Sequence, residues 1–253
     1  MNRRLTRREL LAGTGAALGA AALNGPAARS ALGAVAGSGI PQWGIAVDLA
    51  RCENKAGCRA CIDTCHATHR VPAMADPHHA IKWLWKEPFP RVFPEQVHGW
   101  EDKSRLQAPV LVLCNHCRQS PCTRVCPTGA TWRRRDGVVA MDEHRCIGCR
   151  YCMAACPYGS RSFNWEEPHP SPHNGNYPKR TAGVVEKCTL CVERIDGGQI
   201  PLCVEACQAA GASALTFGNL EDSSSPLRAL LSTRQVLRRR PALGTEPSVF
   251  YLL

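Results

Sequence analysis

The chain has 253 residues, enough for one or two compact domains, and its apolar content of 44% is ordinary. Its formal charge is +10, but five arginines and one glutamate lie within residues 1–36, so the remainder carries +6. The arginine runs at residues 133–135 and 238–240 are short and isolated, which argues against the continuous basic surface of a nucleic-acid-binding protein. The unusual feature is cysteine, which occurs 16 times.

The first predicted element is an export signal. Residues 6–11 (TRRELL) resemble a twin-arginine signal. A weakly apolar stretch rich in glycine and alanine follows at residues 10–23, and residues 34–36 (AVA) offer the small side chains of a cleavage site. The apolar stretch is shorter than the roughly 20 residues that a membrane-spanning helix needs. Residues 1–36 are therefore expected to be a twin-arginine signal peptide.

The cysteines fall into four groups of four, called quartets here, and none is left over. In chain order the quartets are Cys52, Cys58, Cys61, Cys65; Cys114, Cys117, Cys122, Cys126; Cys146, Cys149, Cys152, Cys156; and Cys188, Cys191, Cys203, Cys207. Strand-forming runs precede three of them, at residues 43–50, 108–114 and 183–188, and another follows the fourth at 214–218. Asp136-Gly137, between quartets two and three, predicts a β-hairpin.

Three chemistries can explain such cysteines: disulfide bonds, structural zinc and iron–sulfur clusters. Disulfides suit an exported protein with an even cysteine count, but disulfide scaffolds are usually short chains. Structural zinc favours two CxxC pairs separated by a longer loop, which only quartet four approaches. Quartet three reads C-x2-C-x2-C-x3-C-P, the bacterial ferredoxin signature. Repetition of the motif, with Pro127 and Pro157 after quartets two and three, favours four 4Fe–4S clusters.

In this signature the fourth cysteine ligates the other cluster of a pair. Quartets two and three are close in sequence, so we expect them to exchange their last cysteines, which leaves quartets one and four to do the same. The predicted metal ligands are Cys114, Cys117, Cys122 with Cys156; Cys146, Cys149, Cys152 with Cys126; Cys52, Cys58, Cys61 with Cys207; and Cys188, Cys191, Cys203 with Cys65. Four oxidised clusters would contribute a charge of about −8, for which the basic residues would be counter-charge.

The other quartets depart from the signature. Quartet one has five residues in its first gap, quartet two has four in its second, and quartet four has eleven in its second. Quartets one and four also carry His66 and Gln208 where the proline would stand. The run from Cys61 to His66 is one residue too long for the C-x-x-C-H haem motif. No pattern suggests a substrate-converting site, so we expect the cofactors to carry the chemistry.

These elements predict an α+β protein of two ferredoxin-like modules, each holding two 4Fe–4S clusters. The modules are expected to be related by pseudo-symmetry, with the second inserted in the first. Module A is discontinuous, over residues 42–75 and 179–225, and module B spans residues 108–170. A loop insertion at 76–107 and a C-terminal tail at 226–253 complete the chain.

Two segments outside the modules have predictions of their own. Residues 76–107 contain four prolines and three tryptophans, including Trp83 and Trp100. Such a loop either covers a cluster or presents aromatic anchors to a partner, and the sequence leaves both open. Residues 226–240 predict a short amphipathic helix that ends at Pro241, with arginines in its last turn.

The order and spacing of the quartets, over about residues 43–220, resemble the four-cluster electron-transfer subunits of membrane-associated oxidoreductases. Residues 144–165, 179–195 and the tail PALGTEPSVFYL are most similar to DsrO-type subunits, the periplasmic iron–sulfur subunits of DsrMKJOP complexes of dissimilatory sulfur metabolism. The resemblance implies electron relay between a quinone-interacting membrane subunit and redox partners, among them a periplasmic multihaem cytochrome c and other subunits of the complex. It also implies a periplasmic location, peripheral to the cytoplasmic membrane.

Two alternatives remain open. The same cofactors would serve the electron-transfer subunit of a molybdopterin reductase acting on thiosulfate, polysulfide or tetrathionate. A zinc or disulfide scaffold that only binds other proteins belongs to a different class, and analysis of iron and acid-labile sulfide would distinguish it.

Overall fold

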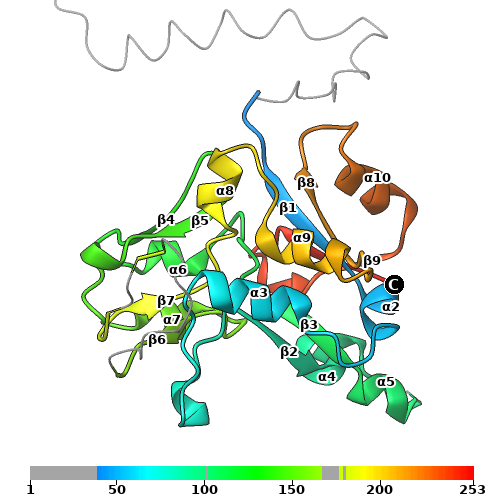
Figure 1. Ribbon diagram of the computed structural model, residues 1–253, viewed down its shortest axis with the longest axis horizontal. Helices are drawn as coiled ribbons and strands as arrows, with labels where there is room; N and C mark the ends of the chain where they lie inside the picture. The colour runs from blue at the N-terminus through cyan, green and yellow to red at the C-terminus, as the bar shows by residue number, and fades with distance from the viewer. Residues whose placement is uncertain (1–38, 101, 167–176, 179–180) are drawn as a thin grey trace, which may run out of the picture. The chain divides into compact units, whose positions relative to one another are not determined.

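The computed structural model describes residues 39–100, 102–166, 177–178 and 181–253. The predicted signal peptide, residues 1–36, lies outside these described residues. Short helices and short strands alternate along the described chain, in agreement with a mixed α/β fold. Its strands form one four-stranded sheet and three two-stranded sheets (Figure 1). Within the described ranges no helix is both long and apolar enough to cross a membrane.

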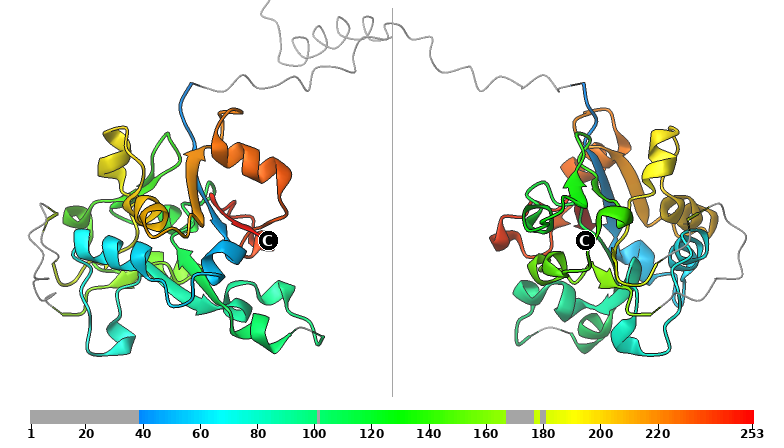
Figure 2. Two further views of the ribbon diagram at one scale, coloured as in Figure 1. Left: turned by 45° about the vertical axis from the view of Figure 1, so that its right-hand side comes forward. Right: turned by 90° about the vertical axis from the view of Figure 1, so that its left-hand side faces the viewer.

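The four-stranded sheet has the order β8-β1-β10-β9 and joins the two ends of the described chain (Figures 1 and 2). β1 (Trp43–Asp48) pairs antiparallel with β8 (Leu215–Asn219) and parallel with β10 (Val249–Leu252). β10 also pairs antiparallel with β9 (Val236–Leu237). All four residues of β10 are buried because it is an inner strand. The predicted C-terminal tail is thus an integral part of the sheet that leads into quartet one.

The predicted helix over residues 226–240 is shorter than expected. α10 (Pro226–Thr233) begins at the proline, but the backbone of Arg234 is extended and the chain then forms β9. The arginines expected in the last helical turn therefore lie beyond the helix, and that part of the prediction was wrong. Arg239 is buried, with its guanidinium 5.1 Å from the ring centre of Tyr158. The helix ends early because the residues after it form β9, which pairs with β10. The amphipathic pattern of residues 226–240 holds no information about that pairing.

Helices α3 (Ala60–Thr68) and α9 (Leu202–Ala209) lie side by side and carry cysteines of quartets one and four (Figure 1). Each helix has two cysteines four residues apart, which places both on one helix face. The side chains of all four are buried between the helices and the core. Two further helices flank them, α2 (Leu49–Glu53) after β1 and α8 (Val192–Asp196) before α9.

Quartets two and three lie on a second group of elements. α6 (Pro121–Arg124) packs against α7 (Tyr151–Ala155). The predicted hairpin is confirmed, because β4 (Thr131–Arg133) pairs antiparallel with β5 (Val139–Met141) around Asp136-Gly137. A further pair joins β6 (Ser162–Phe163) to β7 (Val185–Glu186).

The predicted loop insertion contains regular structure. β2 (Leu84–Pro88) pairs antiparallel with β3 (Pro109–Leu113), the strand predicted before quartet two. Trp83 is only 1% exposed and its ring centre lies 4.9 Å from that of His69, whereas Trp100 is 94% exposed. Only Trp100 of these two could therefore anchor a partner. The remaining short elements are α4 (Phe89–Val92), α5 (Lys103–Gln107), η1 (Pro77–His79), η2 (Pro94–Gln96), η3 (Glu143–Arg145) and η4 (Pro241–Leu243).

Candidate metal centre

The first group of cysteines, called site 1, forms where α3 meets α9. Burial, followed by the negative charges of the neighbouring thiolates Cys207, Cys52 and Cys58, raises the pKa of Cys61 to about 12. Burial also raises the pKa of Cys52, to which Cys207 and Cys58 again contribute. The backbone N–H of Ala214 donates to Sγ of Cys207 at 3.2 Å. Three cysteines of quartet one therefore lie with the last cysteine of quartet four.

Site 2 is the reciprocal arrangement. Burial raises the pKa of Cys65 well above its usual range, and the charges of Cys188, Cys203 and Cys191 raise it further. The backbone N–H of Leu190 donates to Sγ of Cys188 at 3.4 Å. The last cysteine of quartet one thus lies among the first three of quartet four.

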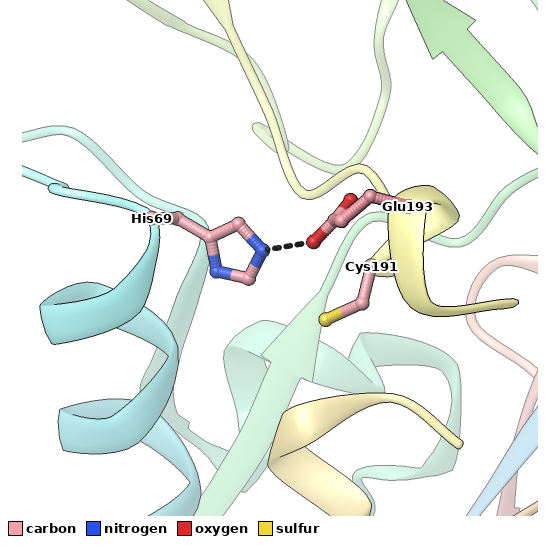
Figure 3. Close-up of side chains that lie close together, drawn as sticks. All are labelled: His69, Cys191 and Glu193. Carbon is pink, nitrogen blue, oxygen red and sulfur yellow. Dashed lines mark hydrogen bonds and ion pairs between the residues drawn. The ribbon is translucent and has the colours of Figure 1, made fainter. Parts of the chain in front are cut away.

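A buried histidine stands beside site 2. Nε2 of His69 lies 3.0 Å from a carboxylate oxygen of Glu193 (Figure 3). Its Nδ1 lies 2.9 Å from the carbonyl oxygen of Cys65. Burial opposes protonation, but hydrogen bonds with Cys191 and Glu193 raise the pKa of His69 to about 9. Ligand atoms of His69, Cys191 and Glu193 lie within 4.8 Å of one another. Because Cys191 belongs to site 2, the group forms that site's surroundings rather than a separate centre.

Site 3 is a largely enclosed pocket. The residues that line it include Cys114, Cys117, Cys122 and Cys156, together with Asn115. Burial raises the pKa of Cys117 to about 12, and the charges of Cys114, Cys122 and Cys156 contribute. Three cysteines of quartet two thus surround one cavity with the last cysteine of quartet three.

Site 4 holds the remaining cysteines and is the most exposed of the four. Burial raises the pKa of Cys152, and the charge of Cys146 contributes. Partial burial opposes the charge of Cys126, but hydrogen bonds with Thr131, Thr128 and Ala130 outweigh it and lower the pKa of Cys126. A lower pKa favours the thiolate that a metal requires. Cys149 is exposed. The inclusion of Cys126 and Cys149 in site 4 rests on the spacing of the motif.

The sites follow one another through pairs of neighbouring cysteines. The charge of Cys122 in site 3 acts on Cys152 in site 4. The charge of Cys114 in site 3 acts on Cys188 in site 2, whose pKa burial raises to about 12. The charge of Cys61 in site 1 acts on Cys65 in site 2, and both cysteines lie on α3. The resulting order is site 4, site 3, site 2, site 1.

The donor groups fit iron–sulfur clusters. All sixteen cysteines are free thiols, and an iron–sulfur cluster of this type takes four thiolates. Thiolates this close repel one another, and a bound metal compensates that repulsion. In the described part of the chain, neither polar atom of the buried Asn115 amide has a hydrogen-bond partner, although the residue lines the pocket of site 3. A sulfur-rich group in that pocket would offer the amide an acceptor.

Three cations near the sites were missed by the sequence reasoning, which treated positive charge as solvated surface or general counter-charge. Arg161 and Lys187 are only 5% and 2% exposed. Lys86, from the predicted loop insertion, donates to the carbonyl oxygen of Cys58 at 2.9 Å. The sequence offers one signal for such cations, which is their closeness to a cysteine motif. Lys187, for example, directly precedes Cys188.

Curated relatives identify the family. The chain is 40% identical over 233 residues to the "Hdr-like menaquinol oxidoreductase iron-sulfur subunit 1" of Archaeoglobus fulgidus, which covers 83% of this chain and 82% of the relative. It is 34% identical over 247 residues to "Protein NrfC" of Escherichia coli, covering 97% and 94%. The chain belongs to the family of 4Fe–4S electron-transfer subunits. Another relative is a subunit of the tetrathionate reductase of Salmonella typhimurium, which is 33% identical over 218 residues, covering 85% and 74%.

A family model of the 4Fe–4S dicluster domain also matches residues 110–171 and 169–219. These matches include quartets two, three and four, while quartet one lies before them. The predicted 4Fe–4S cofactor and the general electron-transfer function are confirmed at the level of the family.

The glycine within quartet three leads to a testable prediction. Gly148 has a φ of +68°, and a Cβ atom there would collide with the backbone carbonyl oxygen of Gly183. Left-handed backbone costs an ordinary residue about 1–2 kcal/mol, and overpacking adds a similar amount. We expect Gly148→Ala to destabilise the holoprotein by roughly 2–4 kcal/mol, which lowers the thermal midpoint by about 5–15 °C. Thermal unfolding followed by circular dichroism, with iron analysis before heating, measures this.

Gly159 offers a matched control. Its φ is +63°, but a Cβ atom there would meet nothing within 4 Å. Gly159→Ala should therefore lower the midpoint by only about half as much, through backbone strain alone. Equal effects of the two substitutions would contradict the role assigned to the close approach of Gly148 and Gly183.

Proposed function

We propose that the chain holds four 4Fe–4S clusters, one at each of sites 1 to 4, and relays single electrons along them. The observation that carries the proposal is which cysteines of α3 lie near which cysteines of α9. Cys61 lies with Cys207, while Cys65, one turn further along α3, lies with Cys203. Reciprocal ligation of this kind is the arrangement of two-cluster ferredoxins.

The order of the sites supports a linear relay. When bound, each cluster supplies a group that accepts and donates one electron. In this proposal the protein would hold these groups in a row, which is supported by cysteines of neighbouring sites that act electrostatically on one another. Site 4, with the exposed Cys149, stands at one end, and we assign it contact with a redox partner.

The pairing of sites also supports the two nested modules. Sites 1 and 2 would belong to module A, residues 42–75 with 179–225, and sites 3 and 4 to module B, residues 108–170. Packing of α3 against α9 and of α6 against α7 supports this division. Pseudo-symmetry between the modules is part of the same proposal.

For the biological setting we propose a DsrO-like periplasmic subunit of dissimilatory sulfur metabolism. Its partners would be a quinone-interacting membrane subunit, a periplasmic multihaem cytochrome c and other subunits of a membrane-bound complex. The relative from Archaeoglobus, which is named as a menaquinol oxidoreductase subunit, supports the quinone link. The leader resembling a twin-arginine signal supports export to the periplasm, where the chain would associate with the membrane through its partners.

The alternative is the electron-transfer subunit of a molybdopterin reductase. The tetrathionate reductase relative favours it, as does a selenate reductase subunit from Mesobacillus selenatarsenatis, which is 32% identical over 229 residues. Purification from the native membrane under mild detergent separates the two. Haem c and a quinone-reactive subunit in the purified complex support the first proposal, and molybdopterin supports the second.

The cofactor content is tested on the purified chain. We expect about 16 iron atoms and about 16 acid-labile sulfide ions per chain, at four of each per cluster. Electron paramagnetic resonance of the reduced protein should show interacting paramagnetic clusters. Zinc in place of iron, or a metal-free disulfide-bonded chain, would refute the proposal and support the scaffold alternative.

A further inference from the structure

Arg161 is a buried cation whose guanidinium contacts a cysteine sulfur. Its Nη2 donates to Sγ of Cys122 at 3.1 Å and to the hydroxyl of Thr131 at 2.8 Å. The Thr131 hydroxyl in turn donates to the carbonyl oxygen of Ala140, so it presents a lone pair to the arginine. The third contact is from Nη1 to Sδ of Met141 at 3.6 Å. Among the described residues, none of the hydrogen-bond partners of Arg161 is a carboxylate.

A guanidinium in this position needs a counter-charge. Arginine stays protonated in proteins, and an uncompensated buried ion is strongly destabilising. Arg161 is buried, and the sulfur of Cys122 that its guanidinium contacts can supply negative charge as a thiolate. Cys122 of site 3 packs in one buried cluster with Cys152 of site 4. The cation therefore lies at the junction between these two sites.

A second buried cation marks the next junction. Nζ of Lys187 donates to the carbonyl oxygens of Val139 and Cys188, the latter at 2.8 Å. Cys188 belongs to site 2 and is the cysteine on which Cys114 of site 3 acts. Lys187 donates to carbonyl oxygens, whereas Arg161 donates to sulfur itself. Arg161 thus combines a positive charge with a hydrogen bond to a ligand atom.

We propose, on the basis of the proposed function, that Arg161 acts through its contact with Cys122 and raises the reduction potentials of the clusters at sites 3 and 4. Reduction adds one electron to an already anionic group, so a nearby cation stabilises the reduced form. Hydrogen bonds to the sulfurs and net charge are known determinants of cluster potential. Because water is excluded around Arg161, its charge is weakly screened.

Potentiometric titration of the holoprotein, followed by electron paramagnetic resonance, tests this with Arg161→Gln. We expect the affinity of at least one cluster for its electron to fall by about tenfold, which is about 59 mV for a one-electron step. Arg124→Gln is the matched control, because Arg124 is exposed and lies two residues after Cys122. Arg124→Gln should shift the potentials less than Arg161→Gln does. Arg161→Lys, which keeps the charge, should also shift them less than Arg161→Gln.

Unchanged potentials in an Arg161→Gln protein with full iron content would overturn the proposal, as would equal shifts for Gln and Lys. If Arg161→Gln does not assemble, isotope labelling of the unsubstituted protein decides. Arginine labelled with ¹⁵N at the guanidinium should show hyperfine coupling to a reduced cluster, and Arg161→Lys should lack it. No coupling in the unsubstituted protein overturns the proposal. Absence of iron–sulfur clusters from the unsubstituted protein, by contrast, would refute the proposed function.

Discussion

The double variant Cys61→Ala/Cys207→Ala should lose one cluster, whereas Cys61→Ala/Cys203→Ala should lose two. Both variants remove one cysteine from α3 and one from α9. They differ only in which of two cysteines, one helical turn apart, is taken from α9. In the proposed arrangement Cys61 and Cys207 ligate the same cluster at site 1, and Cys203 ligates the cluster at site 2.

The physical reason is the way in which the cysteines of α3 pair with those of α9. The charges that act on Cys61 come from Cys207, Cys52 and Cys58, and those that act on Cys203 come first from Cys188 and Cys191. Cys61 and Cys203 are both buried, so water could not take the place of either ligand without opening the core. Each alanine variant therefore loses a ligand that no neighbouring group can replace.

The number of iron atoms per chain is measured on anaerobically purified proteins. We expect about 12 iron atoms for the Cys61/Cys207 pair and about 8 for the Cys61/Cys203 pair, against about 16 without substitution. Cys65→Ala/Cys203→Ala is the reciprocal control and should again leave about 12, because both cysteines belong to site 2. Equal iron contents for the two variants that share Cys61→Ala would contradict crossed ligation.

Much of the local structure was predictable, because short-range patterns determine it. The Asp136-Gly137 turn predicted its hairpin, and the apolar runs predicted β1 and β3. The grouping of cysteines into quartets came from motif spacing alone. These features depend on neighbours within a few residues, which is the range over which periodicity and turn chemistry act.

The non-local features were not predictable in the same way. β10 pairs with β1 across about two hundred residues, and the run PSVFYL carries no mark of its partner. Trp83 could cover a cluster or anchor a partner on sequence grounds, and only its packing against His69 decides. Arg161 and Lys187 look like surface charges until tertiary packing encloses them beside the thiolates. Burial of a charge is a property of the whole fold.

Removal of the iron should unfold much of the protein. Five cysteines of sites 1 and 2 belong to the largest apolar core, where their side chains pack with those of β1, α3, β3 and α9. Binding of a metal group by such ligands contributes directly to the free energy of folding. Without it, the pocket at site 3 would be empty, and the buried cations Arg161 and Lys187 would lose compensating negative charge. The expected loss exceeds the roughly 5–15 kcal/mol of net stability of an ordinary domain.

Chelation of iron under anaerobic, reducing conditions should therefore abolish the near-ultraviolet circular dichroism and the cooperative thermal transition. Reducing conditions matter because they prevent the freed thiols from forming disulfides, which would restrain the unfolded chain. Reconstitution with iron and sulfide should restore both signals. An apoprotein that keeps a cooperative transition near the midpoint of the holoprotein would show that the sheet β8-β1-β10-β9 and its core suffice to hold the fold. The cysteines would then be attached to a scaffold that is stable without them, and the buried charges of Arg161 and Lys187 would need another source of compensation.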